Sequence, residues 1–421
     1  MFDIRLMRQI DNQVGNAACS VLAAVKKLRP TRPVSDAPIR KIAVAKFFGM
    51  GSIVVASPSL QALREVYPEA EIHFITFTSN REILDILGKT DRQWFIDNSS
   101  ASAFTRTTYE VARGLRREKI DLLLDFEFFA KFPLVLGSLA GIPRSAGFCL
   151  TPEPWRMTLL DVPGSYNHYY HTKDIFLSLV YLLKTQDLYY LQFDEFRRKY
   201  TYPRVSVDPA DVAEVRRILA TQGASGRRLV VVNPNTSPEL APEVRKWPEE
   251  RYAELTQRIL NEYGDTHVVF IGAKGDRAYV ERIVKRVGSP RATSVAGELN
   301  LRRLLALFSI TDLLVSNDSG PMHLACLVDT PVIGLFFADT PTLFAPLASR
   351  ARCVAPDLYS LPLFTVYNGK DAVAGKPIDV ISNVPARTVP VDRVMSDVHA
   401  LLPKLEQATQ PASNQPASSR V

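Results

Sequence analysis

The stretch that decides the fold reads Ser316-Asn317-Asp318-Ser319-Gly320-Pro321-Met322-His323-Leu324-Ala325 and lies between apolar runs at 312–315 and 331–337. This order of residue types predicts a strand, a tight turn, a helix and a second strand. Ser319 is placed to cap the helix, Gly320 lets the backbone turn closely, and Pro321 suits a first helical position. An ordinary capped helix after a strand is the simplest interpretation of this segment alone.

The start of this helix is also a candidate anion site. Free backbone amides and the positive end of the helix dipole favour a bound phosphate or diphosphate. His323 lies in the first helical turn, where its ring could reach such an anion.

Length and composition limit the class of protein. The chain has 421 residues, of which 46% are hydrophobic, so it can bury two domain cores. Its net charge of +7 (51 basic minus 44 acidic residues) suits an anionic substrate or an anionic membrane face. No basic-aromatic module of a nucleic-acid-binding protein is present. We therefore expect no nucleic-acid partner.

The cysteines and acidic residues indicate neither a metal nor a cofactor. The four cysteines lack the spacing of a zinc site, an iron cluster or a disulfide framework, and a reducing cytoplasm is their simplest location; they are Cys19, Cys149, Cys326 and Cys353. Carboxylates and histidines likewise lack the spacing of a dedicated metal site.

Strand and helix patterns alternate through both halves of the chain. The first half has buried strand runs at 39–47, 71–75 and 120–124 with helical patterns at 58–66 and 81–87. The second half has strands at 228–232 and 267–271 with helices at 248–263, 276–286 and 301–308. Such alternation predicts two Rossmann-like domains with parallel sheets and with ligands beyond the carboxyl ends of the strands. Prolines at 203 and 209 place the join near 202–211.

The N-terminal stretch to about residue 37 carries apolar residues at helical spacing and basic residues around them. The stripe consists of Met7, Ile10, Val14, Ala17, Val21, Ala24 and Leu28. Its longest apolar run, 17–25, is too short to span a bilayer, and acidic residues at 3 and 11 argue against a signal peptide. A helix on an anionic membrane and a helix packed on the body of the protein are equally good interpretations. The Gln-, Pro-, Ala- and Ser-rich end at 406–421 should be disordered.

The decisive stretch, followed by Asp-Thr-Pro-Val-Ile-Gly-Leu-Phe at 329–336, resembles the signature of glycosyltransferase family nine, the ADP-heptose:lipopolysaccharide heptosyltransferases. This resemblance implies the GT-B architecture, an α/β fold of two Rossmann-like domains with parallel sheets facing across a cleft. We expect an amphipathic helix over 1–37, an acceptor domain over 38–205, a nucleotide-sugar donor domain over 206–390, a C-terminal helix over 391–405 that could return to the first domain, and the tail at 406–421.

The resemblance also implies a donor site in the second half. The loop at 232–237 resembles the element that contacts the donor phosphates, through Thr236 and Ser237. Arg245 stands where the family usually has lysine and can still neutralise phosphate. Asp276 matches an acidic position that contacts the nucleoside, although helix capping explains it equally well locally. The remaining donor residues are Asp318, Ser319, Gly320, Pro321 and His323.

The acceptor half departs from the family pattern. Gly51-Ser52 replaces the family's Gly-Asp, whose aspartate is regarded as the base, and an unassisted serine cannot act as a general base near neutral pH. We expect Glu127, in a loop after another strand, to replace that base, and Lys131 to bind an acidic acceptor group or to balance the charge. The alternative is a solvated Glu127 paired with Lys131. His168 and Tyr169 resemble an acceptor-side segment, for which packing is the simpler explanation.

These features predict an inverting, metal-independent glycosyltransferase without cofactor. It would transfer a sugar, most simply heptose from ADP-heptose, to a lipopolysaccharide-type or other cell-envelope glycan. Two alternatives stay open: a GT-B transferase or epimerase with another nucleotide-sugar, or a catalytically degenerate nucleotide-sugar-binding protein. The expected location is the cytoplasm, with residues 1–37 as a peripheral contact to the cytoplasmic face of the inner membrane.

Overall fold

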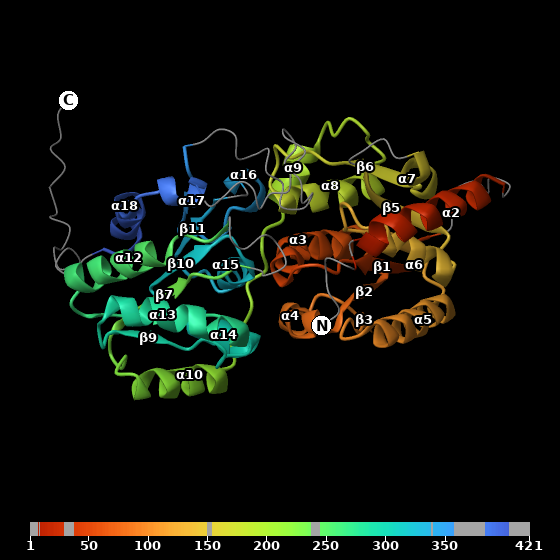
Figure 1. Ribbon diagram of the computed structural model, residues 1–421. Helices are drawn as coiled ribbons and strands as arrows, with labels where there is room; N and C mark the ends of the chain where they lie inside the picture. The colour runs from red at the N-terminus through yellow and green to blue at the C-terminus, as the bar shows by residue number, and fades with distance from the viewer. Residues whose placement is uncertain are drawn as a thin grey trace, which may run out of the picture. The chain divides into compact units, whose positions relative to one another are not determined.

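The structure is a computed structural model that describes residues 7, 9–28, 38–149, 154–236, 245–337, 340–357 and 384–403 (Figure 1). The chain forms two compact units. The first comprises Met1–Ser206 and Thr340–Leu347, and the second comprises Val207–Asp339 and Ala348–Val421.

The first unit is built on a parallel six-stranded sheet in the order β3-β2-β1-β4-β5-β6. Its strands are β1 (Lys41–Ala45), β2 (Glu71–Phe77), β3 (Arg92–Ile96), β4 (Leu122–Asp125), β5 (Arg144–Cys149) and β6 (Val162–Ser165). Its helices are η1 (Asp11–Gly15), α2 (Asn16–Leu28), α3 (Met50–Val66), η2 (Thr78–Asn80), α4 (Arg81–Leu87), α5 (Ala101–Glu118), α6 (Phe132–Ala140), α7 (Pro154–Leu159), α8 (Thr172–Thr185), α9 (Phe193–Arg198) and α16 (Pro341–Phe344).

The second unit repeats this plan with the strand order β12-β11-β10-β7-β8-β9, again all parallel. Its strands are β7 (Arg228–Asn233), β8 (Thr266–Phe270), β9 (Ala292–Ser294), β10 (Leu313–Asn317), β11 (Val332–Leu335) and β12 (Ala351–Val354). Its helices are α10 (Pro209–Thr221), α12 (Glu249–Glu262), η3 (Lys274–Asp276), α13 (Arg277–Val287), α14 (Leu301–Ser309), α15 (Gly320–Cys326), α17 (Val384–Thr388) and α18 (Val391–Leu401).

The predicted α/β class with two Rossmann-like units is confirmed. Central strands such as β4 and β10 are buried along their whole length, as expected for parallel strands covered on both faces. In both sheets the strand order reverses beside a central strand, β1 in the first and β7 in the second. Side chains just beyond the carboxyl ends of these strands therefore occupy the usual position for ligands in such sheets.

The predicted start of the helix at residue 58 is wrong, because α3 already begins at Met50. Gly49 precedes it with φ 82°, a conformation that favours glycine. Pro58 lies inside α3 and cannot donate to the carbonyl of Val54. The Ser57 hydroxyl donates to that carbonyl at 2.6 Å instead, so this helix continues through the proline.

The two ends of the chain differ in what the structure shows. The expected return of the C-terminal helix to the first domain is wrong for the described part, because α18 buries Val394 and Val398 in the core of the second unit. The tail at 406–421 lies outside the described residues. At the other end, α2 contacts α6 and α7, and its Cys19 and Ala23 are buried in the first core. The N-terminal helix thus packs on the body of the first unit.

Candidate functional site

The loops after β1 and β4 meet at the carboxyl edge of the first sheet, because these strands are neighbours with Ala45 opposite Asp125. The Glu127 side chain crosses between the two loops. Its Oε1 accepts hydrogen bonds from Lys46 Nζ at 2.9 Å and from the backbone N–H groups of Phe47 at 2.7 Å and Phe48 at 3.1 Å. The structure therefore brings the predicted carboxylate to the first loop, although that loop carries no aspartate of its own.

The alternative interpretation, in which Glu127 pairs with Lys131, is wrong. Glu127 is buried and forms an ion pair with Lys46, whose ammonium is also buried. Lys131 Nζ instead donates to Asn12 Oδ1 at 2.9 Å. A buried carboxylate beside one cation and two amides is strongly held, so Glu127 is not the solvated loop residue of the alternative interpretation.

A second buried pair fixes the backbone of Glu127. Arg156 Nη2 donates to the Glu127 carbonyl at 3.1 Å and lies 3.6 Å from Asp125 Oδ2, while Arg156 Nε donates to the Phe148 carbonyl at 2.6 Å. Asp125 Oδ1 accepts from the Glu127 N–H at 2.9 Å. Burial raises the pKa of Asp125 to about 7, and the Arg156 charge opposes this shift.

Gly51 and Ser52 lie in the first turn of α3, directly after β1 and its loop. Gly51 is buried, and Ser52 is partly exposed. A Cβ atom added at Gly49 would lie 3.2 Å from Ser52 Oγ, so the serine hydroxyl lies close over the turn. The position of the missing aspartate therefore carries a hydroxyl that is too weakly basic for proton abstraction.

The N-terminal segment contacts the loop that bears Lys131. Asp11 accepts from the Lys131 N–H at 3.0 Å and the Phe132 N–H at 2.9 Å, at the start of α6. A Cβ atom at Gly15 would lie 3.0 Å from Lys131 Cβ, so the two backbones approach closely here. Lys131 thus joins the acceptor-side loop to the N-terminal segment, a contact that the sequence did not indicate.

His168 and Tyr169 lie before α8 and are exposed, with ring centroids 4.4 Å apart. The simpler explanation by packing is therefore wrong for these two side chains. It holds for Tyr166, whose ring packs edge-on against Phe128 at 4.8 Å. Two exposed rings next to each other can cover the face of a sugar.

In the predicted donor site, polar side chains from the ends of β7 and β10 form hydrogen bonds with one another at the carboxyl edge of the second sheet. Asn233 Nδ2 donates to Ser316 Oγ at 2.9 Å and to Ser319 Oγ at 2.8 Å. Asn317 Oδ1 accepts from the Tyr252 hydroxyl at 2.6 Å, and Asn317 Nδ2 donates to the Pro234 carbonyl at 3.0 Å. These buried bonds hold the loop after β7 and the turn before α15 together.

Arg245 and Asp318 form a buried ion pair beside this cluster. Arg245 Nη2 donates to the Asp318 carbonyl at 2.7 Å and to Asp318 Oδ2 at 2.9 Å. Burial raises the pKa of Asp318 above its ordinary value, and the guanidinium opposes the shift. The structure thus joins two residues that were predicted separately, 73 positions apart in the chain.

The predicted side-chain cap of Ser319 is wrong. Ser319 stands at the N-cap of α15, but its hydroxyl donates to the Asn317 carbonyl at 3.1 Å and accepts from Asn233. Gly320 is the first helical residue, so Pro321 takes the second position. His323 is buried, and burial lowers its pKa to about 4, which keeps the ring neutral at pH 7. A neutral ring contributes no charge to an anion site.

The other predicted donor residues differ from one another in burial and hydrogen bonding. Thr236 is buried, and its Oγ1 has no hydrogen-bond partner among the described residues. Asp276 is partly exposed and its Oδ2 accepts from the Ala273 N–H at 3.0 Å, which supports the local structural interpretation without excluding contact with a ligand. Ser237 lies outside the described residues.

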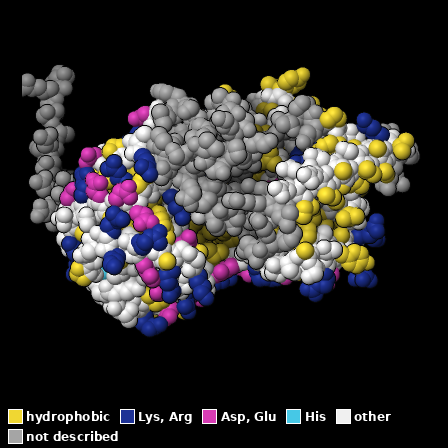
Figure 2. All heavy atoms as spheres, in the orientation of Figure 1, with side chains coloured by type: hydrophobic (Ala, Val, Ile, Leu, Met, Phe, Trp, Pro, Cys, Tyr) yellow, Lys and Arg dark blue, Asp and Glu magenta, His cyan; other side chains and the backbone are white. Residues whose placement is uncertain are grey.

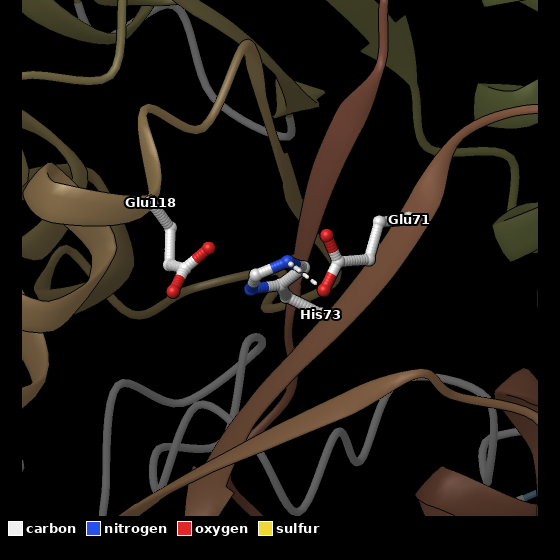
Figure 3. A group of neighbouring side chains, drawn as sticks. All are labelled: Glu71, His73 and Glu118. Atoms are coloured by element: carbon white, nitrogen blue, oxygen red, sulfur yellow. Dashed lines mark ion pairs between the residues drawn. The ribbon is translucent and has the colours of Figure 1, made fainter.

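Glu71, His73 and Glu118 lie close enough together to suggest a metal site (Figure 3). However, Trp94 Nε1 donates to His73 Nδ1 at 3.0 Å, so the neutral ring carries its proton on Nε2, which lies 3.3 Å from Glu71 Oε1. A ligating histidine needs a free lone pair there.

Cations already hold both carboxylates of this group. Lys41 Nζ lies 2.7 Å from Glu118 Oε2, and Arg92 Nε lies 2.9 Å from Glu71 Oε1. Glu71 and Lys41 are the first residues of their strands, at the sheet edge opposite Glu127. We therefore interpret the group as an ion cluster that joins the strand starts.

Sequence reasoning missed several residues that build these sites. Lys46 carried a usable signal, because a lysine inside an apolar strand run requires a carboxylate partner. Asn233 and Asn317 stand at strand ends within the loops already considered. Arg156 gave no signal, since its contact with Glu127 spans 29 positions that include α6 and β5. Among the described residues, no helix is both long and apolar enough to cross a bilayer.

Comparison with known proteins points to one family. Residues 174–369 match the model of glycosyltransferase family 9 (heptosyltransferase), a range that includes the described donor cluster. Lipopolysaccharide heptosyltransferase 2 of Salmonella typhimurium is 29% identical over 164 residues, which are 38% of this chain and 43% of that protein. The chain thus spans less than half the length of this curated relative.

Solved structures agree over a longer range. Escherichia coli ADP-heptose lipopolysaccharide heptosyltransferase II matches with a TM-score of 0.66 at 18% identity, over 88% of this chain and 100% of that one. The E. coli heptosyltransferase WaaC with ADP matches with a TM-score of 0.59 at 14% identity, over 86% and 99%. At these identities the likeness shows a shared fold. Together with the sequence matches, it shows that this chain is similar to heptosyltransferases of glycosyltransferase family 9.

Proposed function

We propose that this protein is an inverting glycosyltransferase that transfers heptose from ADP-heptose to a lipopolysaccharide-type or other cell-envelope glycan. The buried Arg245–Asp318 pair is the observation that carries the proposal. It lies beside the Asn233–Ser319 bond, at the strand ends where parallel sheets bind ligands and within the range of the family match.

In this proposal each donor-site residue has a role that follows from its chemistry. The charge of Arg245 would stabilise the diphosphate as it leaves. Asp318 would keep the guanidinium in place. The hydroxyl of Thr236 would contact a phosphate oxygen, and Asp276 would accept a hydrogen bond from the nucleoside.

Glu127 is the proposed general base. An acceptor hydroxyl would attack the anomeric carbon while the bond from that carbon to the diphosphate oxygen breaks, and the hydroxyl proton would pass to Glu127. Oε1 is occupied by three donors, whereas Oε2 makes no hydrogen bond among the described residues. We assign proton transfer to Oε2. Ser52 and Gly51 would line the acceptor side, and His168 and Tyr169 would cover its sugar.

Donor titration tests the first half of the proposal. The protein should bind ADP-heptose in preference to UDP-sugars, and Arg245→Met should weaken that binding by about tenfold to a hundredfold, the range for a charge-assisted contact. Arg245→Lys should retain most of the affinity because the charge remains. Arg251→Met is the matched control, since Arg251 lies on α12 and pairs with Glu254. Equal affinity of Arg245→Met and the wild type would contradict the donor site.

We also propose a cytoplasmic location with peripheral contact to the inner membrane through the N-terminal segment. The basic net charge of +7 and the apolar stripe of that segment support this contact. A glycan acceptor of the envelope is often lipid-linked, so such a contact would bring the enzyme to its substrate.

A further inference from the structure

The apolar stripe of the N-terminal helix points away from the protein. Val14, Val21 and Leu28 are 61%, 64% and 85% exposed, whereas Cys19 and Ala23 are 0% and 5% exposed. The helix therefore packs through Cys19, Ala23 and the partly buried Leu22, whereas most of the apolar stripe faces outward. A helix that served only to cover the core would have the reverse orientation.

The apolar surface continues onto the neighbouring helices. Leu139 of α6 and Met157 of α7 are 58% and 52% exposed, and both helices contact α2. Figure 2 shows hydrophobic side chains gathered over this part of the first unit. We call the outward residues Ile10, Val14, Val21, Leu28, Leu139 and Met157 the apolar face. Exposed apolar side chains that gather in this way mark a binding surface more often than scattered ones do.

The charges around the apolar face are mainly basic. Residues 16–28, 132–140 and 154–159, which form α2, α6 and α7, contain no aspartate or glutamate. The adjacent helix α5, which contacts α6, exposes Arg106, Arg113, Arg116 and Arg117 against one exposed glutamate, Glu110. Figure 2 shows basic side chains at the margin of the hydrophobic area. An apolar centre with a basic border complements an anionic bilayer surface.

A second copy of the chain would fit this surface less well. Residues 10, 14, 17, 21, 24 and 28 have the alternating spacing of three and four that helix pairs use. However, the apolar face spreads over three helices, and pairing two such faces would bring two basic borders together. Like charges in that position oppose self-association.

We propose that the apolar face docks the protein on an anionic phospholipid membrane, with α2 lying in the interface and the arginines of α5 contacting lipid headgroups. Lys26 contacts the protein rather than lipid, because its Nζ forms an ion pair with Asp161 at 2.7 Å. This pair anchors α2 to the body of the first unit. The segment is thus anchored to the first unit with its part of the apolar face outward. This inference deepens the membrane contact proposed above.

Vesicle binding by the full chain tests the inference. Wild type should bind phosphatidylcholine vesicles that contain phosphatidylglycerol, should bind pure phosphatidylcholine more weakly, and should lose affinity as salt rises. The triple variant Val14→Ser, Val21→Ser, Leu28→Ser should lose about tenfold or more. Arg113→Glu with Arg117→Glu should lose mainly the preference for phosphatidylglycerol. Leu188→Ser with Leu191→Ser is the matched control, because these leucines are 66% and 83% exposed elsewhere on the same unit.

Each possible outcome of these measurements leads to a different conclusion. All substituted residues are exposed, so thermal unfolding should stay unchanged and report the folded state of each variant. Wild type that fails to bind, or a triple variant that binds as well as the control, would overturn the inference. Wild type that is dimeric by light scattering, with the triple variant monomeric, would assign the apolar face to self-association instead. The assay uses no sugar donor, so its failure leaves the transferase proposal untouched.

Discussion

At the scale of single residues, Glu127 and Lys46 form a buried ion pair in which each charge compensates the other. Both side chains are buried, and their charged atoms lie 2.9 Å apart. Removing one partner of such a pair leaves an uncompensated buried charge, whereas removing both leaves none. The pair therefore makes a stability prediction that is independent of catalysis.

We expect Lys46→Met to lower the free energy of unfolding by about 3 kcal/mol, and Glu127→Gln to lower it by a similar amount. The double variant should lose less than the sum, because neither charge then remains buried alone. Urea unfolding of the wild type, both single variants and the double variant measures this coupling. Strictly additive losses would show that the two charges do not stabilise each other.

His323 gives a pH prediction with a definite sign. Burial lowers its pKa from 6.5 to about 4, so between these values the unfolded ring binds a proton and the folded ring does not. Stability is therefore full above about pH 6.5, falls as the pH drops, and levels off below about pH 4, for a total of about 3 kcal/mol. Unfolding at about pH 7 and about pH 4.5 should show a smaller loss in His323→Gln than in the wild type. Equal losses of stability in the variant and the wild type would show that a group other than His323 titrates in this range.

At the scale of elements, the N-terminal segment contacts the loop that we propose for the acceptor. The Asp11 carboxylate accepts hydrogen bonds from the N–H groups of Lys131 and Phe132 at the start of α6, as a capping side chain normally does. The same helix follows the loop of Glu127 and Lys131. A change at Asp11 should therefore reach the acceptor loop without touching the substrate.

We expect Asp11→Ala to destabilise the protein by about 1 to 2 kcal/mol, as the loss of a helix cap does. It should also raise the KM for the acceptor more than the KM for the donor. Asp208→Ala is the control, because Asp208 caps α10 through the N–H of Ala210 in the second unit. Unfolding curves and separate KM measurements check both expectations, and an equal effect of the two variants on acceptor KM would contradict the proposed link.

Element positions followed from the sequence where one periodicity dominated. The helix at 81–87 has the predicted bounds, and the strand at 228–232 is short by one residue. The start of α3 was missed because Pro58 looked like a helix start, although the Ser57 hydroxyl satisfies the carbonyl that the proline leaves free. The side of α2 that faces the protein could not be predicted either, since it is formed by Cys19, Leu22 and Ala23, which lie outside the apolar stripe.

At the scale of the whole molecule, the alternation of strands and helices was enough to predict two parallel sheets, because each strand run is followed by a chain long enough for a crossover. The site was predictable only in part. Arg245 and Asp318 were each expected from local motifs, but their ion pair depends on how the loops fold together. The partner of Glu127, Lys46, could not be predicted, since distance along the chain says little about which cation a buried carboxylate meets.

The central claim is that this chain transfers a sugar from a nucleotide donor. Single-turnover release of ADP from ADP-heptose, with and without a cell-envelope glycan extract, tests it most directly. We expect rapid release by the wild type only when the extract is present, and none by the double variant Lys46→Met, Glu127→Gln, even though that variant still binds the donor. A wild type that binds ADP-heptose but releases no more ADP with the extract than the double variant does would contradict the claim.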